Sequence, residues 1–271
     1  MKLIVIPPIR APFSYRSKDE GQFMIKEILK NLERKGQMVG VEYDVDDGWE
    51  RNTRILARDE EFFTYLSAGF LDRVKQYSEG GKYDAIVSNS SIDPAFFAVK
   101  QICKIPISCA MHAAAHMASL IGERFSIIEL TDAMAIIDRR KIESYGLGHK
   151  LASVRPIGFN DTEVADLNYK YRKEERRNVP ECRNVIDAMV AQGIAAIEKE
   201  RADTLLIGCP AIQLYEDEVR EGLDKAGYSE VPLLIEVAAG VEMAKAMVNM
   251  KIKQAARAYP SDELKIKPEF R

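Results

Sequence analysis

The stretch Asp84–Ser90 reads DAIVSNS, and its form returns in the second half of the chain as Asp203–Cys209, DTLLIGC. Each copy begins with an aspartate, runs through an apolar segment and ends on a hydroxyl or thiol side chain. Each is followed by a helical stretch and then by a proline-marked apolar run, Ile105–Ile107 and Val231–Leu233. The repeat predicts two similar lobes in which the final serine and cysteine stand at equivalent strand ends and face one cleft. The alternative is two unrelated buried strands.

Around the repeat, short apolar runs alternate with longer stretches whose apolar residues lie three and four positions apart. This alternation is typical of α/β architecture with parallel sheets and helices on both faces. The predicted strands are Lys2–Ile6, Met38–Tyr43, Ala85–Ser88, Ile105–Ser108, Phe125–Leu130, Leu151–Ile157, Thr204–Ile207 and Leu233–Glu236. The predicted helices are Glu20–Arg34, Ala57–Tyr77, Pro94–Cys103, Ala113–Leu120, Asp132–Tyr145, Glu181–Arg201, Glu216–Ala226 and Ala238–Ala258. We assign residues 1–111 and 213–271 to the first lobe, and 112–212 to the second.

Two segments depart from this alternation. Asn160–Pro180 is polar and rich in charge, and we expect a loop or a short surface helix there. Tyr259–Arg271 has two prolines and little periodicity, which predicts an extended tail that packs on a neighbouring subunit. A homo-oligomer is therefore expected.

Composition excludes several classes of protein. The 271 residues are 30% charged and 46% hydrophobic, which is typical of a globular protein, and the net charge is −3. This balance indicates neither a nucleic-acid partner nor an anionic membrane surface. The apolar run in Met1–Pro8 is too short for a signal peptide or a membrane span. No cysteine pair is spaced as C-x-x-C, so we expect reduced thiols, no metal and a cytoplasmic protein.

Cys209 is the strongest candidate for chemistry, because it directly follows a predicted buried strand. In parallel sheets ligands bind beyond the carboxyl ends of the strands, where backbone N–H groups and helix N-termini favour negative charge. We therefore expect a lowered pKa and a thiol that can act as base, acid or nucleophile. Gly208 and Pro210 suit a tight turn on either side of it. The alternative is an inert buried cysteine.

The other candidates are weaker. Ser90 lies between Asn89 and Ser91 in a turn, and a serine hydroxyl is a poor base unless a neighbour takes its proton. These side chains either hydrogen-bond a substrate or only form the turn. His112 and His116 stand four apart on one helical face, but a third metal ligand is not evident. We expect His112 in the cleft and no metal site.

Four separated segments resemble the aspartate/glutamate/hydantoin racemase superfamily, and most closely its hydantoin racemase branch. They are Asp84–Pro94 (DAIVSNSSIDP), Pro106–Leu130, Asp203–Ala211 (DTLLIGCPA) and Val231–Val248, in the order that the family has them. The resemblance implies two pseudo-symmetric α/β lobes with the site between them and no cofactor. It also implies two cysteines that face the substrate α-carbon from opposite sides, one removing a proton and the other returning one.

The chain departs from this family pattern at three positions. The second catalytic cysteine matches Cys209, but the first falls on Ser90. The Asn-Pro-Asn that usually follows the first strand reads Pro7-Pro8-Ile9, followed by Arg10, which could pair with a substrate carboxylate or lie on the surface. A glutamate usually stands where this chain has His112. The resemblance places both loops against the substrate, so these differences imply a ligand other than a standard hydantoin.

The sequence thus predicts a cofactor-independent racemase or isomerase that acts at a carbon next to a carbonyl or carboxylate. Cys209 and Ser90 are the predicted catalytic residues, and backbone N–H groups after them are expected to stabilise enolate charge. We expect the small-molecule substrate, a carboxylate or a cyclic amide, to be contacted by Pro8, Asn89, Ser91, His112, Pro210 and Ala211. The alternatives are a single-cysteine decarboxylase, as in the family's arylmalonate decarboxylases, a lyase or hydrolase, or a ligand-binding relative without catalysis.

Overall fold

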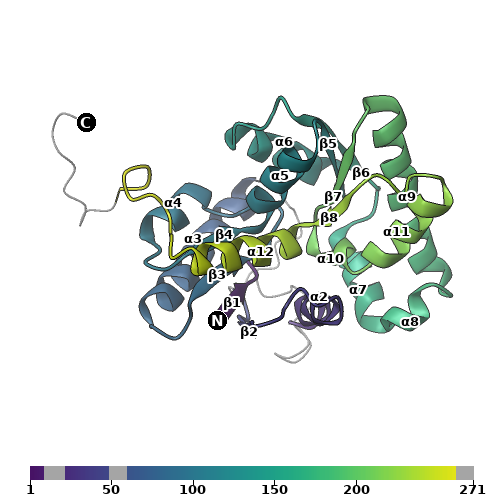
Figure 1. Cartoon of the computed structure of the whole chain (residues 1–271). Coiled ribbons are helices and arrows are strands. Elements are labelled where there is room, and N and C mark those ends of the chain that lie inside the picture. The colour runs from purple at the N-terminus through teal and green to yellow at the C-terminus, as the bar shows by residue number, and fades with distance from the viewer. Residues whose placement is uncertain (9–21, 49–59, 261–271) are drawn as a thin grey trace.

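The computed structural model describes residues 1–8, 22–48 and 60–260, and it arranges them as two parallel sheets with flanking helices (Figure 1). The first sheet has the strand order β2-β1-β3-β4. Its strands are β1 (Lys2–Ile6), β2 (Glu42–Val45), β3 (Ala85–Ser88) and β4 (Ile107–Cys109). The helices of this part of the chain are α2 (Phe23–Arg34), α3 (Glu60–Glu79) and α4 (Phe96–Ile102). The chain therefore completes one four-stranded sheet before the second begins.

The second sheet repeats the first, with the strand order β6-β5-β7-β8. Its strands are β5 (Phe125–Glu129), β6 (Leu151–Pro156), β7 (Thr204–Ile207) and β8 (Leu233–Ile235). Its helices are α6 (Asp132–Ser144), α7 (Asp161–Lys170), α8 (Lys173–Arg176), α9 (Pro180–Glu200), α10 (Pro210–Gln213) and α11 (Glu216–Lys225). The predicted α/β architecture with two similar parallel sheets is confirmed.

The aspartates that open the two copies of the repeat have the same structural role. Asp84 accepts a hydrogen bond from the backbone N–H of Lys2 at 2.6 Å, where β1 begins. Asp203 accepts from the N–H groups of Glu123 and Arg124, at 2.7 and 3.1 Å, just before β5. Each carboxylate thus ties a central strand to its neighbour, which sets the register of the pair.

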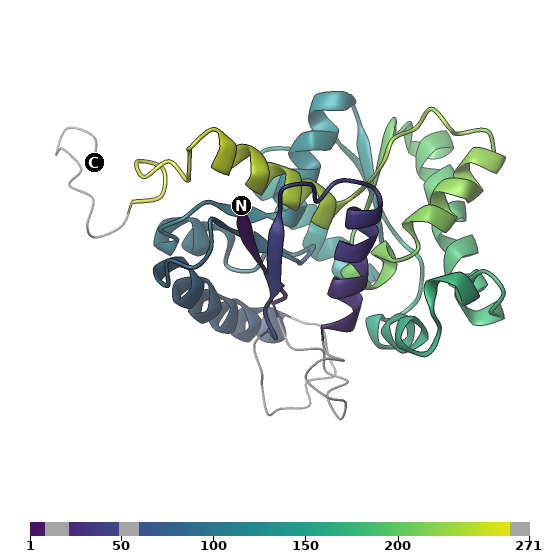
Figure 2. The same cartoon turned by 60° about the horizontal axis from the view of Figure 1, so that its bottom comes forward.

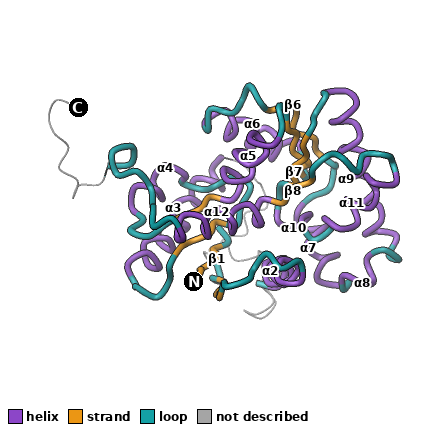
Figure 3. Tube along the Cα trace, viewed as in Figure 1, coloured by secondary structure: helices purple, strands orange, loops and turns teal. Residues whose placement is uncertain are grey.

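Two helices lie between the sheets, as the orange strand groups and the helix between them show (Figure 3). They are α5 (Ala110–Ile121), which follows β4, and α12 (Glu236–Asn249), which follows β8, and they pack on each other. α12 also contacts β3 and β4, so closely that a Cβ on Gly240 would lie 3.1 Å from Val87 Cγ1. The lobe limits stay a prediction. If the lobes are divided by sheet, β8 belongs to the second lobe because it pairs with β7. The chain then returns to the first lobe at α12.

The element limits differ from the prediction at several places. β2 begins at Glu42 rather than Met38, because the chain turns through Gly40 with a φ of 75°. α12 ends at Asn249 rather than Ala258, and Lys251 follows with a φ of 56°. The predicted start of the second helix at Ala57 and most of the predicted tail lie outside the described residues. In the part of the chain that the structure describes, no helix is both long and apolar enough to cross a membrane.

The polar segment Asn160–Pro180 forms short helices rather than a loop. It forms α7 and α8, and Val164, Asn168 and Arg176 on these helices are buried. Asn168 Nδ2 donates to the carbonyl oxygen of Ala211 at 2.6 Å, so α7 supports the turn that follows β7. The prediction of a short surface helix is confirmed, because most residues of the segment are exposed or half-buried. Asn168 and Arg176, however, bind backbone carbonyl groups inside the protein.

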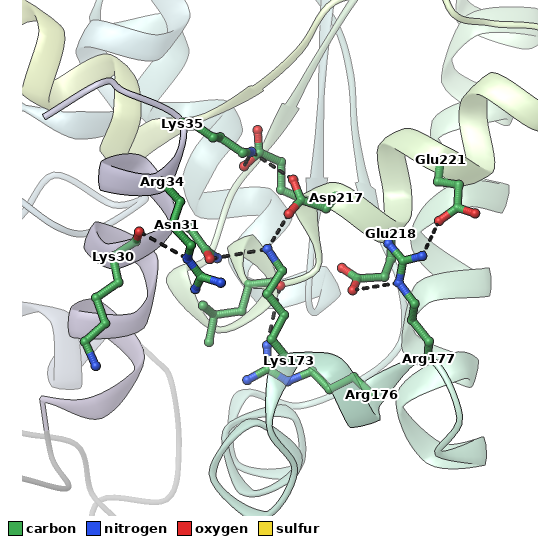
Figure 4. A network of polar contacts seen from close by, with 12 residues as sticks. Lys30, Asn31, Arg34, Lys35, Lys173, Arg176, Arg177, Asp217, Glu218 and Glu221 are labelled. Atoms are coloured by element: carbon green, nitrogen blue, oxygen red, sulfur yellow. Dashed lines mark hydrogen bonds and ion pairs between the residues drawn. The ribbon is translucent and has the colours of Figure 1, made fainter.

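Helix α2 joins the two halves of the molecule, lying between β2 and the helices of the second lobe (Figure 2). Just after α2, Lys35 contacts Glu216 Oε2 at 2.6 Å and Asp217 Oδ1 at 2.9 Å. Lys173 of α8 donates to Asn31 Oδ1 at 3.3 Å and also binds Asp217 (Figure 4). These partly exposed ion pairs form a network that spans the lobes, although such pairs individually contribute about 1 kcal/mol or less.

Candidate active site

The turn after β3 carries three predicted site residues, Asn89, Ser90 and Ser91, and all three are buried. The backbone N–H of Asn89 donates to the carbonyl oxygen of Ile6 at 3.0 Å, which fixes the turn to β1. Asn89 is only 1% exposed, yet its side-chain Oδ1 and Nδ2 have no hydrogen-bond partner among the described residues. An unsatisfied buried amide is costly. This amide is therefore available to bind a polar ligand atom.

The turn after β7 carries Cys209, which is free, 8% exposed and directly followed by the four-residue helix α10. Gln213 fixes the turn from within. Its Nε2 donates to the carbonyl oxygen of Gly208 at 2.6 Å and to Glu236 Oε1 at 2.8 Å. Pro210 is half-buried and Ala211 is buried on the same turn. Three of the predicted site residues therefore lie together here.

Glu129 at the end of β5 is the side chain that binds the backbone of Cys209. Its Oε2 accepts from the Cys209 N–H at 3.1 Å, and its Oε1 accepts from the Leu130 N–H at 2.6 Å. The carboxylate occupies space that a side chain on Gly208 would need, since a Cβ there would lie 2.4 Å from Glu129 Oε2. Glu129 is fully buried and is a site residue that the sequence analysis missed.

The pKa of the Cys209 thiol is raised well above its ordinary value, by burial first and then by the charges of Glu129 and Asp161. The lowered pKa that the sequence predicts is therefore wrong. The predicted stabilisation of a thiolate is weak because α10 is a single turn, Pro210 has no N–H, and the Cys209 N–H is bonded to Glu129. The resting thiol is protonated at neutral pH.

Four carboxyl groups among the described residues are fully buried: Asp93, Glu129, Asp138 and Glu236. Glu236 relates the turns to each other. It hydrogen-bonds Gln213 beside Cys209, and its pKa is raised by burial and then by the charge of Asp93, which lies just after Ser91. That Ser90 and Cys209 face one cleft remains a prediction.

These carboxyl groups make stability depend on pH. Burial raises the pKa of Asp93 to about 6, and its folded form therefore holds a proton that the unfolded form releases near pH 4. The resulting stabilisation is present below pH 4 and is lost as the pH rises through 6. We expect the free energy of unfolding to fall by about 3 kcal/mol from this group between pH 4 and 7, measured by urea unfolding.

The matched variant for this prediction is Asp93→Asn, which keeps an acceptor for the N–H of His112 and the hydroxyl of Tyr145. It should remove about 3 kcal/mol of the pH-dependent loss. An Asp93→Asn protein with the same pH slope as wild type would contradict the assignment. Asp44, whose hydrogen bond with Lys82 helps to lower its pKa to about 2, changes stability only below this pH window.

The ring of His112 lies in a cluster of aromatic and histidine side chains. Its centroid is 4.8 Å from that of Phe96, 4.9 Å from Tyr145 and 4.4 Å from His116. Burial and then the charge of Lys100 lower its pKa to about 3, so the ring is neutral. Its part in substrate binding stays a prediction. Among the described residues, no group of three or more His, Cys, Asp or Glu side chains is arranged to hold a metal ion.

Two further candidates from the sequence, Pro8 and Arg10, follow β1. Pro8 is half-buried in a bend just after β1, and its contact with a substrate stays a prediction. Arg10 lies outside the described residues.

Comparison with known proteins gives concordant results. The sequence model of the Asp/Glu/Hydantoin racemase family matches residues 56–244. A hydantoin racemase from Pseudomonas sp. (strain NS671) is 24% identical over 223 residues, covering 78% of this chain and 80% of the relative. Two solved structures are similar over their full length, each with a TM-score of 0.74 and 18% identity. They are allantoin racemases from Pseudomonas fluorescens, covering 98% of this chain and 99% of that one, and from Klebsiella pneumoniae, covering 100% and 97%.

Proposed function

Because this chain belongs to the Asp/Glu/hydantoin racemase family, we propose that it is a cofactor-independent racemase-type enzyme that acts at a carbon next to a carbonyl group. The observation that carries the proposal is Cys209 on its buried turn at the end of β7, between Gly208 and α10. A strand end of this kind is where ligands meet α/β proteins. The names of the relatives favour a cyclic amide as the substrate, with a 2-substituted carboxylate as the second class.

The proposed step is a proton transfer at the substrate α-carbon. The Cys209 thiol first releases its proton to water. The resulting thiolate takes the α-proton, so the C–H bond breaks, an S–H bond forms and the electron pair moves onto the carbonyl oxygen as an enolate. The thiol then returns a proton to the carbon. The buried amide of Asn89, whose Nδ2 has no partner among the described residues, is the proposed donor to the enolate oxygen.

The two faces of the substrate α-carbon meet groups of different acid–base strength. Cys209 serves one face, whereas the other is served by Ser90, whose hydroxyl is a poor acid and base. Exchange of the α-hydrogen through Cys209 should therefore be faster than inversion of configuration. Chiral chromatography of single enantiomers of allantoin and 5-substituted hydantoins measures inversion directly. Inversion as fast as exchange would contradict this assignment of the two faces.

Ser90→Cys is the variant that tests this asymmetry. A thiol at this position would supply a second group able to act as both acid and base, and we expect the racemisation rate to rise by about 10²-fold. The matched control is Ser91→Cys, which introduces a thiol one residue away and should give no such increase. A rate unchanged in Ser90→Cys, with the fold intact, would show that Ser90 does not face the α-carbon.

One observation favours a second candidate function, a single-cysteine decarboxylase. The resting thiol of Cys209 is protonated, which suits a group that donates a proton to an enediolate after carbon dioxide has left. Release of carbon dioxide from 2-arylmalonates separates this candidate from racemisation, because only the decarboxylase consumes the substrate.

A further inference from the structure

The two lobes differ in the residues that follow their paired central strands, next to Ser90 in the first lobe and Cys209 in the second. In the pairing of β1 with β3, Ile6 stands opposite Ser88, and in the pairing of β5 with β7, Ile128 stands opposite Ile207. The next residues are Pro7 and Asn89 in the first lobe, and Glu129 and Gly208 in the second. Of these two equivalent positions, only the one next to Cys209 therefore has a carboxyl group beside a glycine.

The geometry around Glu129 depends on that glycine. Its Oε2 lies 3.1 Å from the Cys209 backbone nitrogen, and a Cβ on Gly208 would approach the same oxygen to 2.4 Å. The absence of a side chain at this position is what lets the carboxylate reach the N–H of the next residue. The N–H of Gly208 is itself bonded to the Ile128 carbonyl oxygen at 3.0 Å, so the turn is held on both sides.

Of the buried acids near Cys209, Glu129 is the one that we take as negatively charged. Burial raises the pKa of Glu129 above its usual range, whereas the two backbone N–H bonds that its carboxylate accepts, from Leu130 and Cys209, act in the opposite direction and favour the ionised form. Asp138 on α6 is fully buried, and burial and then the charge of Glu129 raise its pKa well above the ordinary value, so it keeps its proton. Asp161 at the start of α7 and Glu236 at the start of α12 are the other acids whose charges act on Cys209.

We propose that Glu129 is a positioning residue for Cys209: its buried carboxylate accepts the backbone N–H of Cys209 at 3.1 Å and sets a negative charge beside the turn that carries the thiol. The inference rests on the proposed function only in taking Cys209 as the group that exchanges protons. The carboxylate makes ionisation of the thiol unfavourable. Because the protonated thiol is a weak nucleophile, Cys209 should react slowly with oxidants and other electrophiles. Its contact with the turn also fixes the direction from which the thiol meets a substrate.

The test is the pH dependence of alkylation of Cys209 by iodoacetamide, read residue by residue by mass spectrometry in the full-length protein. It requires no catalysis, so it can succeed or fail independently of the proposed function. We expect wild-type Cys209 to react with a midpoint above the ordinary range of a cysteine thiol. In Glu129→Gln the reaction at pH 8 should be at least tenfold faster, while labelling of Cys182 stays unchanged.

The matched control is Glu221→Gln, which removes an exposed carboxylate of α11 that pairs with Lys225 and should leave Cys209 labelling as in wild type. Where substrate turnover is measurable, Glu129→Gln should lower kcat more than it changes KM and shift the pH profile toward acid. An unchanged pH midpoint in folded Glu129→Gln would overturn the proposal. A wild-type midpoint within the ordinary thiol range would overturn it without any variant.

Discussion

Replacing Cys209 by serine is expected to lower the rate of α-hydrogen exchange by about 10³-fold or more, because the remaining hydroxyl cannot take and return the proton. Serine is close to cysteine in shape, and the hydrogen bond from the residue 209 N–H to Glu129 involves only the backbone. The variant should therefore keep its fold. The measurement is the exchange rate at saturating substrate, with circular dichroism as the check on structure.

The control for this loss is Cys103→Ser. Cys103 is also buried, but its thiol donates to the Ile105 carbonyl oxygen at 3.2 Å, a bond that a serine hydroxyl can make. We expect this variant to retain the wild-type exchange rate. Equal losses in both variants would indicate a general effect of removing buried thiols, and the assignment of Cys209 would then fail.

Replacing Arg176 by alanine is expected to cost about 3–5 kcal/mol of stability. The side chain is 1% exposed and donates to three carbonyl oxygens, those of Asn168 at 3.3 Å, Tyr171 at 3.2 Å and Leu214 at 3.5 Å. Its guanidinium also lies 5.5 Å from the centre of the Tyr215 ring. Removal leaves these carbonyl groups unsatisfied inside the protein, and each such group is costly.

Urea unfolding of Arg176→Ala measures this loss, and Arg177→Ala is the adjacent control. Arg177 is half exposed and pairs with Glu221 at 2.8 Å and with the buried Glu218 at 3.5 Å (Figure 4), so its removal should cost less than that of the fully buried Arg176. Because α7 supports the Ala211 carbonyl group, Arg176→Ala should also reduce the activity at temperatures where the protein remains folded. A loss of stability no larger than that of Arg177→Ala would contradict the structural role.

The repeat could be read from the sequence because both copies use the same physical devices. The aspartates tie the strands at their start, and the carbonyl groups of Pro106 and Pro232 accept equivalent hydrogen bonds, from Ile86 and Leu205, each at 2.9 Å. The apolar runs between these points are buried. These shared contacts explain why a short sequence pattern predicted two similar lobes.

The site was harder to predict because its electrostatics depend on residues distant in sequence. Glu129 and Cys209 lie 80 residues apart, and their contact exists only once β5 and β7 are paired. A glutamate after four largely apolar residues, FSIIE, was the available signal for a buried carboxylate. The sequence also suggested thiolate stabilisation from the start of a helix, whereas α10 is too short to supply it.

The polar segment Asn160–Pro180 shows what composition leaves open. Its composition indicates a solvated surface, which fits the exposed residues of α7 and α8, but composition cannot show that Asn168 and Arg176 bind carbonyl groups in the interior. The place of His112 in the cleft stays a prediction, and its ring packs against Phe96 and Tyr145. Polar side chains can thus be buried where they donate hydrogen bonds to backbone carbonyl groups that would otherwise be unsatisfied.

The central claim is that this protein moves a proton at a carbon next to a carbonyl group through Cys209. Proton NMR of allantoin, 5-substituted hydantoins and 2-substituted carboxylates in D₂O tests it most directly, because exchange requires only the Cys209 face of the substrate. We expect the α-hydrogen signal of at least one compound to decay with wild-type protein and to persist with Cys209→Ser. Loss of the signal at the same rate with both proteins, or at the buffer rate with folded wild type across all these compounds, would contradict it.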